Sequence, residues 1–123
     1  MGIYVDGFVC PIPRANMQAY REQAERAADV WIEHGALDYV EAVADDVPDG
    51  EVTSFPMSVK LEEGEVVVFA YVVYESRAKR DEVLKKVMED PRLQDDIRNM
   101  PFDGKRMIWG GFESFIRLSG NGG

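Results

Sequence analysis

The chain has 123 residues, 46% of them hydrophobic, and a formal net charge of −9 from 23 acidic and 14 basic residues. This length predicts one domain, and the composition is sufficient for a packed core. The acidic balance opposes nucleic-acid binding, since contacts of Lys and Arg with phosphates supply most of that affinity. It also opposes adsorption to anionic membranes.

The sequence excludes further classes of protein. No apolar run reaches the about 18 residues typical of a membrane span, and the N-terminus lacks the basic and apolar segments of a signal peptide. Cys10 is the only cysteine, which rules out an internal disulfide and a multi-cysteine metal site. We therefore expect a cytoplasmic protein that binds neither nucleic acid nor membrane.

The first predicted strand spans residues 3–9. Neither of its alternating faces is clearly polar, although Asp6 lies among the apolar residues. We expect this acid either to lie at the end of the sheet or to be paired. The prolines of residues 11–13 are expected to end the strand, because proline lacks the N–H that the ladder needs.

A helical pattern follows at residues 14–34. Apolar residues recur there at spacings of three and four and form one stripe. The stripe consists of Met17, Tyr20, Ala24, Ala27, Ala28 and Trp31. Gly35 fits the left-handed position just past a helix end, which places His34 in the last turn.

Four segments lead from this helix to the middle of the chain. Residues 37–44 predict a second strand, and the Asp, Pro and Gly residues of 45–50 predict a turn. Residues 51–61 are predicted as an edge or irregular strand, because Pro56 interrupts an extended pattern. Residues 62–65 predict a hairpin turn into the next strand.

The uncharged run at residues 66–74 is the strongest strand signal in the chain. One of its faces would carry Val66, Val68, Ala70, Val72 and Tyr74, and the other Val67, Phe69, Tyr71 and Val73. An antiparallel strand with one face in water should alternate apolar and polar residues. Since this strand does not, both of its faces need cover.

A second helix is predicted at residues 76–89, with Ser76 as its N-cap. Its expected buried side consists of Leu84, Val87 and Met88. Asp90 followed by Pro91 indicates the start of a short third helix at residues 91–99.

The last predicted strand spans residues 105–118. The adjacent Gly110 and Gly111 within it indicate a bulge or a close backbone approach. Residues 119–123 are predicted to be a flexible tail, so that a single domain spans residues 1–118.

The order strand, helix, strand, strand, helix, strand predicts an α+β protein with the ferredoxin-like βαββαβ arrangement. In this arrangement the four-stranded sheet is antiparallel and both helices pack on one face. The other face would form a large exposed apolar patch, which monomers rarely leave open. We therefore expect a symmetric homodimer whose two sheets pack face to face.

Residues 100–112, with the sequence MPFDGKRMIWGGF, resemble the YbaA-like bacterial proteins, a family of unknown function. Further matching pieces lie at residues 4–8 (YVDGF), 45–50 (DDVPDG), 52–53 (VT), 65–69 (EVVVF) and 88–92 (MEDPR). The resemblance covers almost the whole chain. It implies a dimeric α/β barrel, in which two ferredoxin-like sheets face each other, and it implies no particular chemistry.

Aromatic side chains suggest a ligand pocket between the helices and the sheet. The candidates to line it are Tyr4, Trp31, His34, Tyr39 and Trp109. His34 is the only histidine, and its alternative role is to favour the C-terminus of its helix. Trp31 has an alternative role as ordinary core.

Few other residues suggest chemistry. Cys10 lacks the positive surroundings of a reactive thiolate. The acidic residues of 45–51 have oxygen ligands for a hard cation, but their spacing is not that of a calcium loop, and such sequences are ordinary turns. No catalytic triad, nucleotide loop or cofactor motif is visible, so no catalytic residue, metal or cofactor is assigned.

Two main functions therefore stay open, and metal-dependent catalysis at the turn of residues 45–51 is a third reading that calorimetry with divalent cations would test. The first is a homodimer that binds or transforms a small apolar or aromatic ligand in the pocket between helices and sheet. The second is a non-catalytic structural or regulatory dimer that acts through protein–protein contacts. A well-formed cavity near His34 in each subunit would favour the first function.

Overall fold

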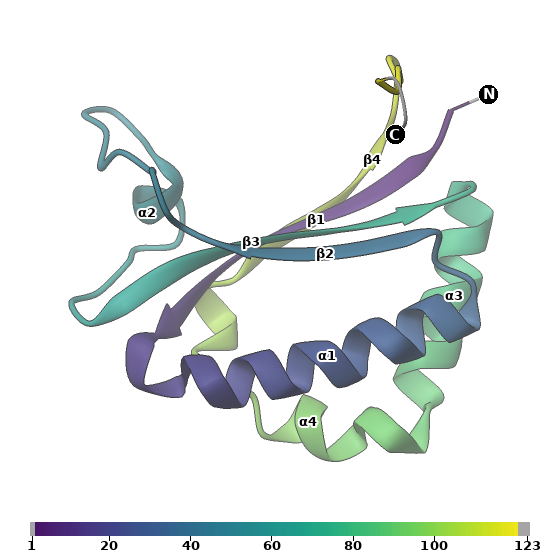
Figure 1. The fold of residues 1–123 in the computed structure, drawn as a ribbon, viewed down its shortest axis with the longest axis horizontal. Helices are drawn as coiled ribbons and strands as arrows, with labels where there is room; N and C mark the ends of the chain where they lie inside the picture. Colours follow the sequence, from purple (N-terminus) through teal and green to yellow (C-terminus); the bar gives the residue numbers. More distant parts are fainter. Residues whose placement is uncertain (1, 121–123) are drawn as a thin grey trace.

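The computed structural model describes residues 2–120 (Figure 1). Its elements are β1 (Tyr4–Pro13), a 3₁₀ turn (Arg14–Asn16), α1 (Met17–His34), β2 (Asp38–Val43), α2 (Phe55–Ser58), β3 (Glu65–Tyr74), α3 (Arg77–Glu89), a 3₁₀ turn (Pro91–Leu93), α4 (Gln94–Arg98), a 3₁₀ turn (Gly104–Arg106) and β4 (Ile108–Glu113). The predicted α+β class with one four-stranded antiparallel sheet is confirmed. Part of the predicted tail, residues 121–123, lies outside the described residues.

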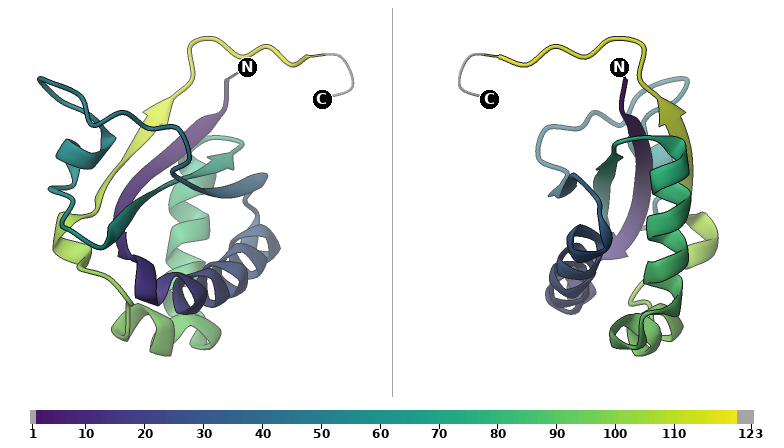
Figure 2. Two further views of the ribbon diagram at one scale, coloured as in Figure 1. Left: turned by 60° about the vertical axis from the view of Figure 1, so that its left-hand side comes forward. Right: turned by 90° about the vertical axis from the view of Figure 1, so that its right-hand side faces the viewer.

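The sheet has the strand order β2-β3-β1-β4. β3 pairs with β1 along its whole length and with β2 on its other edge. The uncharged run is therefore a central strand, as predicted. Helices α1, α3 and α4 lie together on one face of the sheet (Figures 1 and 2).

The helix-facing side of β3 forms much of the core. Val72 and Tyr74 pack with Val30 of α1 and with Val83 and Val87 of α3, and all five are buried. Full burial of one such side chain contributes about 1.5–3 kcal/mol. Ser76 caps α3 as predicted, since its Oγ accepts a hydrogen bond of 3.1 Å from the amide of residue 79. The helices thus supply one of the two covers that β3 needs.

The predicted end of the first strand before residues 11–13 is wrong, because β1 pairs with β3 as far as Pro13. β4 accompanies β1 only to Val9, so one edge of β1 is open beyond that residue. The Arg14 amide donates to the carbonyl of Gly64, the residue just before β3. Since successive residues of a strand point to opposite neighbours, the nitrogens of Pro11 and Pro13 lie on the open edge, where no N–H is required.

The predicted strand at residues 51–61 is also wrong, because this segment is a loop that contains α2. Ser54 Oγ caps the short helix by accepting a hydrogen bond of 3.1 Å from the Met57 amide. Pro56 lies in the first turn, where its missing N–H costs nothing. A proline that interrupts an extended pattern can therefore equally begin a helix.

The α2 segment covers one end of the sheet face opposite α1. Val59 is 1% exposed and packs against Val67. Farther along the same face, Phe69, Ile108 and Phe112 are 42%, 44% and 65% exposed. Residues 2–120 therefore supply only part of the second cover, and we call this sheet side the far face.

β4 is shorter than the predicted strand at residues 105–118. Before it, a 3₁₀ turn is held by Arg106, whose Nη2 lies 2.7 Å from Glu65 Oε2. The ladder of β4 with β1 ends at Glu113, the partner of Tyr4, and beyond it only Ser114 remains linked to that edge, since its amide donates a hydrogen bond of 3.0 Å to the Ile3 carbonyl within the described residues. The partner strand thus limits β4 at its end.

The register of β4 is continuous through its two glycines, so they form no bulge. A close approach is present at Gly111, but side chains make it in place of the predicted backbone. A Cβ atom there would lie 2.6 Å from Arg80 Nη2 and 2.7 Å from Tyr4 Cε2. At Gly110, the nearest atom would be Phe112 Cε1 at 3.6 Å, which is an ordinary contact.

This difference predicts the effect of a single methyl group. Gly111→Ala should lower the free energy of unfolding by about 1–3 kcal/mol, because the packed Tyr4 and Arg80 side chains must move. The matched change Gly110→Ala should alter it by less than about 0.5 kcal/mol. Urea denaturation at one protein concentration measures both variants, and equal losses would contradict the close packing at Gly111.

Candidate functional site

A cavity of about 410 Å³ lies between the sheet and the helices. Its walls come from β1, β2, β3 and β4 on one side and from α1, α3 and α4 on the other. Small side chains leave this space, with Ala24 and Ala27 on α1 and Ala70 on β3. Met88, Ile97 and Trp109 line the cavity and are also exposed to solvent, which places its mouth between α3, α4 and β4.

Three of the five predicted pocket residues line this cavity. Trp31, Tyr39 and Trp109 do so. The rings of Trp31 and Tyr39 are 5.8 Å apart, and Trp31 Nε1 donates a hydrogen bond of 3.0 Å to the hydroxyl of Tyr74. This bond fixes the indole ring against the core.

Tyr4 and His34 do not line the cavity. The Tyr4 ring lies under the Arg80 guanidinium at 5.0 Å, and its hydroxyl accepts a hydrogen bond of 3.1 Å from Arg80 Nη2. His34 Nε2 lies 2.8 Å from Asp90 Oδ2. These two side chains therefore contact other residues of the fold and do not contribute to the cavity wall.

Glu41 is a cavity residue that the sequence argument did not select. Its Oε1 accepts a hydrogen bond from the Tyr20 hydroxyl, and its Oε2 accepts one of 2.7 Å from the Tyr39 hydroxyl. Burial, followed by the charge of Glu41, raises the pKa of both phenols. Both phenols thus stay protonated as donors. Side chains two positions apart in a strand share a face, so Glu41 lies on the same face of β2 as Tyr39. This spacing was the sequence signal that could have identified Glu41 as a cavity residue.

Asp6 also lines the cavity, and it is 1% exposed. Arg80 Nε lies 3.7 Å from its Oδ1. The acid is therefore paired, which was one of the two alternatives expected from the sequence. Neither carboxylate oxygen has a hydrogen-bond partner within residues 2–120. Burial raises the pKa of Asp6 above its ordinary value. The positive charge of Arg80 and the nearby Tyr74 hydroxyl lower this pKa and so oppose the effect of burial, although the hydroxyl is not in hydrogen-bond geometry.

Cys10 lies on the same wall, and it is 3% exposed. Burial, followed by the charge of Glu41, raises the pKa of its thiol to about 12. A thiol with this pKa is protonated at neutral pH and is a poor nucleophile. Cys10 therefore contributes apolar surface to the cavity.

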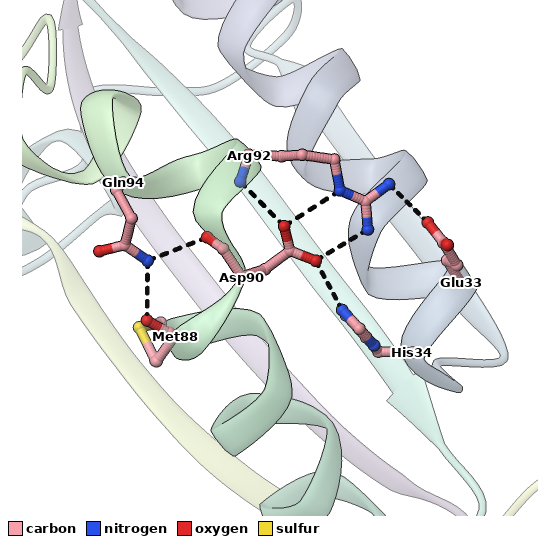
Figure 3. A network of polar contacts seen from close by, with 6 residues as sticks. All are labelled: Glu33, His34, Met88, Asp90, Arg92 and Gln94. Atoms are coloured by element: carbon pink, nitrogen blue, oxygen red, sulfur yellow. Dashed lines mark hydrogen bonds and ion pairs between the residues drawn. The ribbon is translucent and has the colours of Figure 1, made fainter.

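A polar network joins the C-terminus of α1 to the turn after α3 (Figure 3). The Asp90 carboxylate accepts hydrogen bonds from Arg92 Nη2 and from the Arg92 amide at 2.8 and 2.9 Å, and it contacts His34. Arg92 Nη1 reaches Glu33 Oε2 at 2.7 Å. Arg92, followed by His34, holds the pKa of Asp90 well below its ordinary value.

The network predicts a pH-dependent contribution to stability. A carboxyl whose pKa is lowered by folding stabilises the fold above its unfolded pKa of about 3.9, and this stabilisation is lost as the pH falls through the folded pKa. Asp90→Asn should therefore lower Tm at neutral pH, and its difference from the unmodified protein should shrink below about pH 4. Thermal melts across pH measure this difference, and Asp29→Asn, at an exposed position, is the control. The same dependence of Tm on pH in both variants would contradict the prediction.

The acidic turn at residues 45–51 lies away from the cavity, and its four acids are exposed. Within residues 2–120, no three His, Cys, Asp or Glu side chains are arranged to hold a metal ion. None of the helices in that range has the length and apolar character needed to cross a membrane.

Comparison with known proteins identifies the family. Residues 3–104 match the model described as "Protein of unknown function (DUF1428)". The chain belongs to the DUF1428 family. Uncharacterized protein YbaA of Escherichia coli (strain K12) is 55% identical over 113 residues, which are 92% of this chain and 97% of that protein. YbaA of Shigella flexneri gives the same values. The resemblance to YbaA-like proteins is thus confirmed.

This DUF1428 chain is also similar to a solved structure. The crystal structure of a dimeric ferredoxin-like protein from an uncultured marine organism superposes with a TM-score of 0.59. The two chains are 10% identical, and the match covers 97% of this chain and 99% of the other. At this identity the likeness concerns the fold alone, and it supports the ferredoxin-like character of the sheet and helices.

Proposed function

We propose that this protein is a homodimer that binds a small apolar or aromatic ligand in the cavity of each subunit. The observation that carries this proposal is the 410 Å³ cavity, whose lining is almost entirely apolar. Ligand pockets usually have about 300–1,000 Å³ and are lined by apolar and aromatic side chains with a few polar groups. The cavity has this size and this composition.

The far face supports the dimer. Phe69, Ile108 and Phe112 remain exposed there, and two copies could cover each other across a two-fold axis. The structural relative is itself described as dimeric. We propose that the two sheets pack through their far faces as a dimeric α/β barrel, and that the single cysteine reflects a cytoplasmic location.

A thermal-shift screen with small aromatic and lipophilic molecules tests ligand binding. A ligand that binds the folded state at about 100 times its Kd adds about 2.7 kcal/mol of stability. We expect a saturable rise in Tm for several such molecules. The absence of any stabilising molecule, together with a cavity that stays empty in crystals grown with them, would contradict the proposal.

The exposed C-terminal segment favours a second candidate function. Phe115, Ile116 and Leu118 are 93%, 72% and 92% exposed. Such apolar surface is typical of protein contacts, so the alternative is a non-catalytic regulatory dimer that binds another protein through this segment. Repeated hits on small lipophilic molecules in the thermal-shift screen would argue against this alternative.

A further inference from the structure

The charged groups of the cavity lining are of one sign. Three carboxylates line it, from Asp6, Glu41 and Asp96. Within the described part of the chain, residues 2–120, no Lys, Arg or His side chain lines it. The cavity therefore offers hydrogen-bond acceptors and negative charge to whatever enters it.

Two of the three carboxylates are balanced by arginines outside the cavity lining. Asp96 forms a two-point pair with Arg26, with both N–O distances at 2.9 Å. Asp6 faces Arg80, which also lies 3.4 Å from Asp81. These pairs leave no excess positive charge next to the cavity.

Glu41 is the carboxylate without a cationic partner. Its two described hydrogen-bond partners are the neutral hydroxyls of Tyr20 and Tyr39. Each phenol donates its single proton to Glu41, so neither has a further O–H to offer to a ligand. An unpaired charge in a partly buried site is costly and is relieved by a cation that enters the site.

Asp6 supplies acceptor atoms that lack hydrogen-bond partners among the described residues. Both of its oxygens are buried and have no hydrogen-bond partner in the described chain. Arg80 Nε, at 3.7 Å, is beyond hydrogen-bond distance. Because buried polar atoms are almost always hydrogen-bonded in native proteins, a donor group on a bound ligand would complete this site.

The aromatic lining suits the same kind of ligand. Phe8, Trp31, Tyr39 and Trp109 present rings to the cavity. The face of an aromatic ring attracts an organic cation within about 6 Å, and Trp is the best partner. An anion would meet negative ring faces and carboxylates, and the Gln23 amide of the lining already donates to the Asn99 carbonyl.

We propose that the cavity selects lipophilic organic cations, such as amines with an aromatic or aliphatic body, over neutral and anionic molecules of the same shape. Glu41 supplies the unbalanced negative charge, and Asp6 accepts the hydrogen bond of an N–H donor. The inference rests on the proposed ligand-binding function and names the class of ligand.

Isothermal titration calorimetry with three matched probes tests this selection. Phenylbutylamine, phenylbutanol and phenylbutyrate share a phenyl ring and a four-carbon chain and differ in the charge of the head group. At neutral pH the amine should bind at least about tenfold more tightly than the alcohol, since a hydrogen bond to a charged group contributes more than one between neutral groups. The carboxylate should bind more weakly than both.

Two variants test the assigned residues. Glu41→Gln and Asp6→Asn should each weaken binding of phenylbutylamine by about tenfold and change binding of phenylbutanol much less. The control is Asp38→Asn, which removes one negative charge from β2 on the far face and should leave both affinities unchanged. If Asp6→Asn fails to fold because Arg80 loses its partner, the affinity of Glu41→Gln for phenylbutylamine decides between selection and no selection.

Each outcome separates the selection from ligand binding itself. Equal binding of the amine and the alcohol, tighter binding of phenylbutyrate, or an unchanged amine affinity in Glu41→Gln would overturn the selection and leave the proposed function standing. Failure of all three probes to bind would contradict both proposals. Tight amine binding that depends on Glu41 supports both.

Discussion

Phe69→Glu is expected to convert the proposed homodimer into a monomer at micromolar concentration. Phe69 lies near the middle of the far face, with the rings of Phe55 and Tyr71 at 6.0 and 6.2 Å. A glutamate there would bury an unpaired charge in the contact, at a cost of several kcal/mol. A two-fold axis brings the change into the interface twice, so a large rise in the dimer Kd follows.

Sedimentation equilibrium of the variant and of a matched control measures this effect. Ile32→Glu places the same charge on α1 at a residue that is 46% exposed, on an element of the opposite layer. The control should remain a dimer. A dimeric Phe69→Glu protein, or a monomeric Ile32→Glu protein, would contradict the assignment of the far face as the interface.

Ala27→Trp is expected to abolish binding of phenylbutylamine. Ala27 lies on the helix wall of the cavity, and an indole ring at this position would occupy the space that a ligand needs. Because the ring would fill an existing void, the cost in stability should stay below the 1–3 kcal/mol of an overpacked core.

Ala19→Trp is the matched control for the filled cavity. Ala19 is exposed on α1 and does not line the cavity, so this variant should bind the probe as the unmodified protein does. Calorimetry with the same probe measures both variants. Retained binding in Ala27→Trp would show that the probe binds elsewhere.

The two proposals use opposite faces of one strand. Ala70 and Val72 of β3 line the cavity, whereas Phe69 and Tyr71 point to the far face. Alternation along β3 therefore separates ligand binding from dimer formation. A one-residue shift in register would exchange the two sets, and pairing with β1 and β2 on both edges prevents it.

The sequence predicted the central strand and the main helices because their signals are local. The β-branched run of β3, Ser76 as the cap of α3 and the stripe on α1 all act within a few residues. The errors arose where distant pairing decides the outcome. Pro13 remains in a strand because β4 pairs with β1 only as far as Val9. The pairing of β4 ends at Glu113 because Glu113 lies opposite Tyr4, where β1 begins.

The cavity could be predicted only in part. Trp31 and Tyr39 were selected for their aromatic side chains, and both line it. Ala27 was recognised as a buried-face residue, but a pattern of small residues does not show whether larger neighbours fill the space. Asp6 was noted in the first strand, yet its unpartnered oxygens depend on where Arg80 lies, 74 positions along the chain.

Ligand binding inside the cavity is the central claim, and methyl NMR with the neutral probe phenylbutanol tests it most directly. Titration should shift the methyl signals of Ala24, Ala27 and Ala70 to saturation, because these residues line the cavity. The Ala42 methyl, which is exposed on the far face, should not move. Saturable shifts at Ala42 alone, or no shift at the three cavity alanines, would contradict the account.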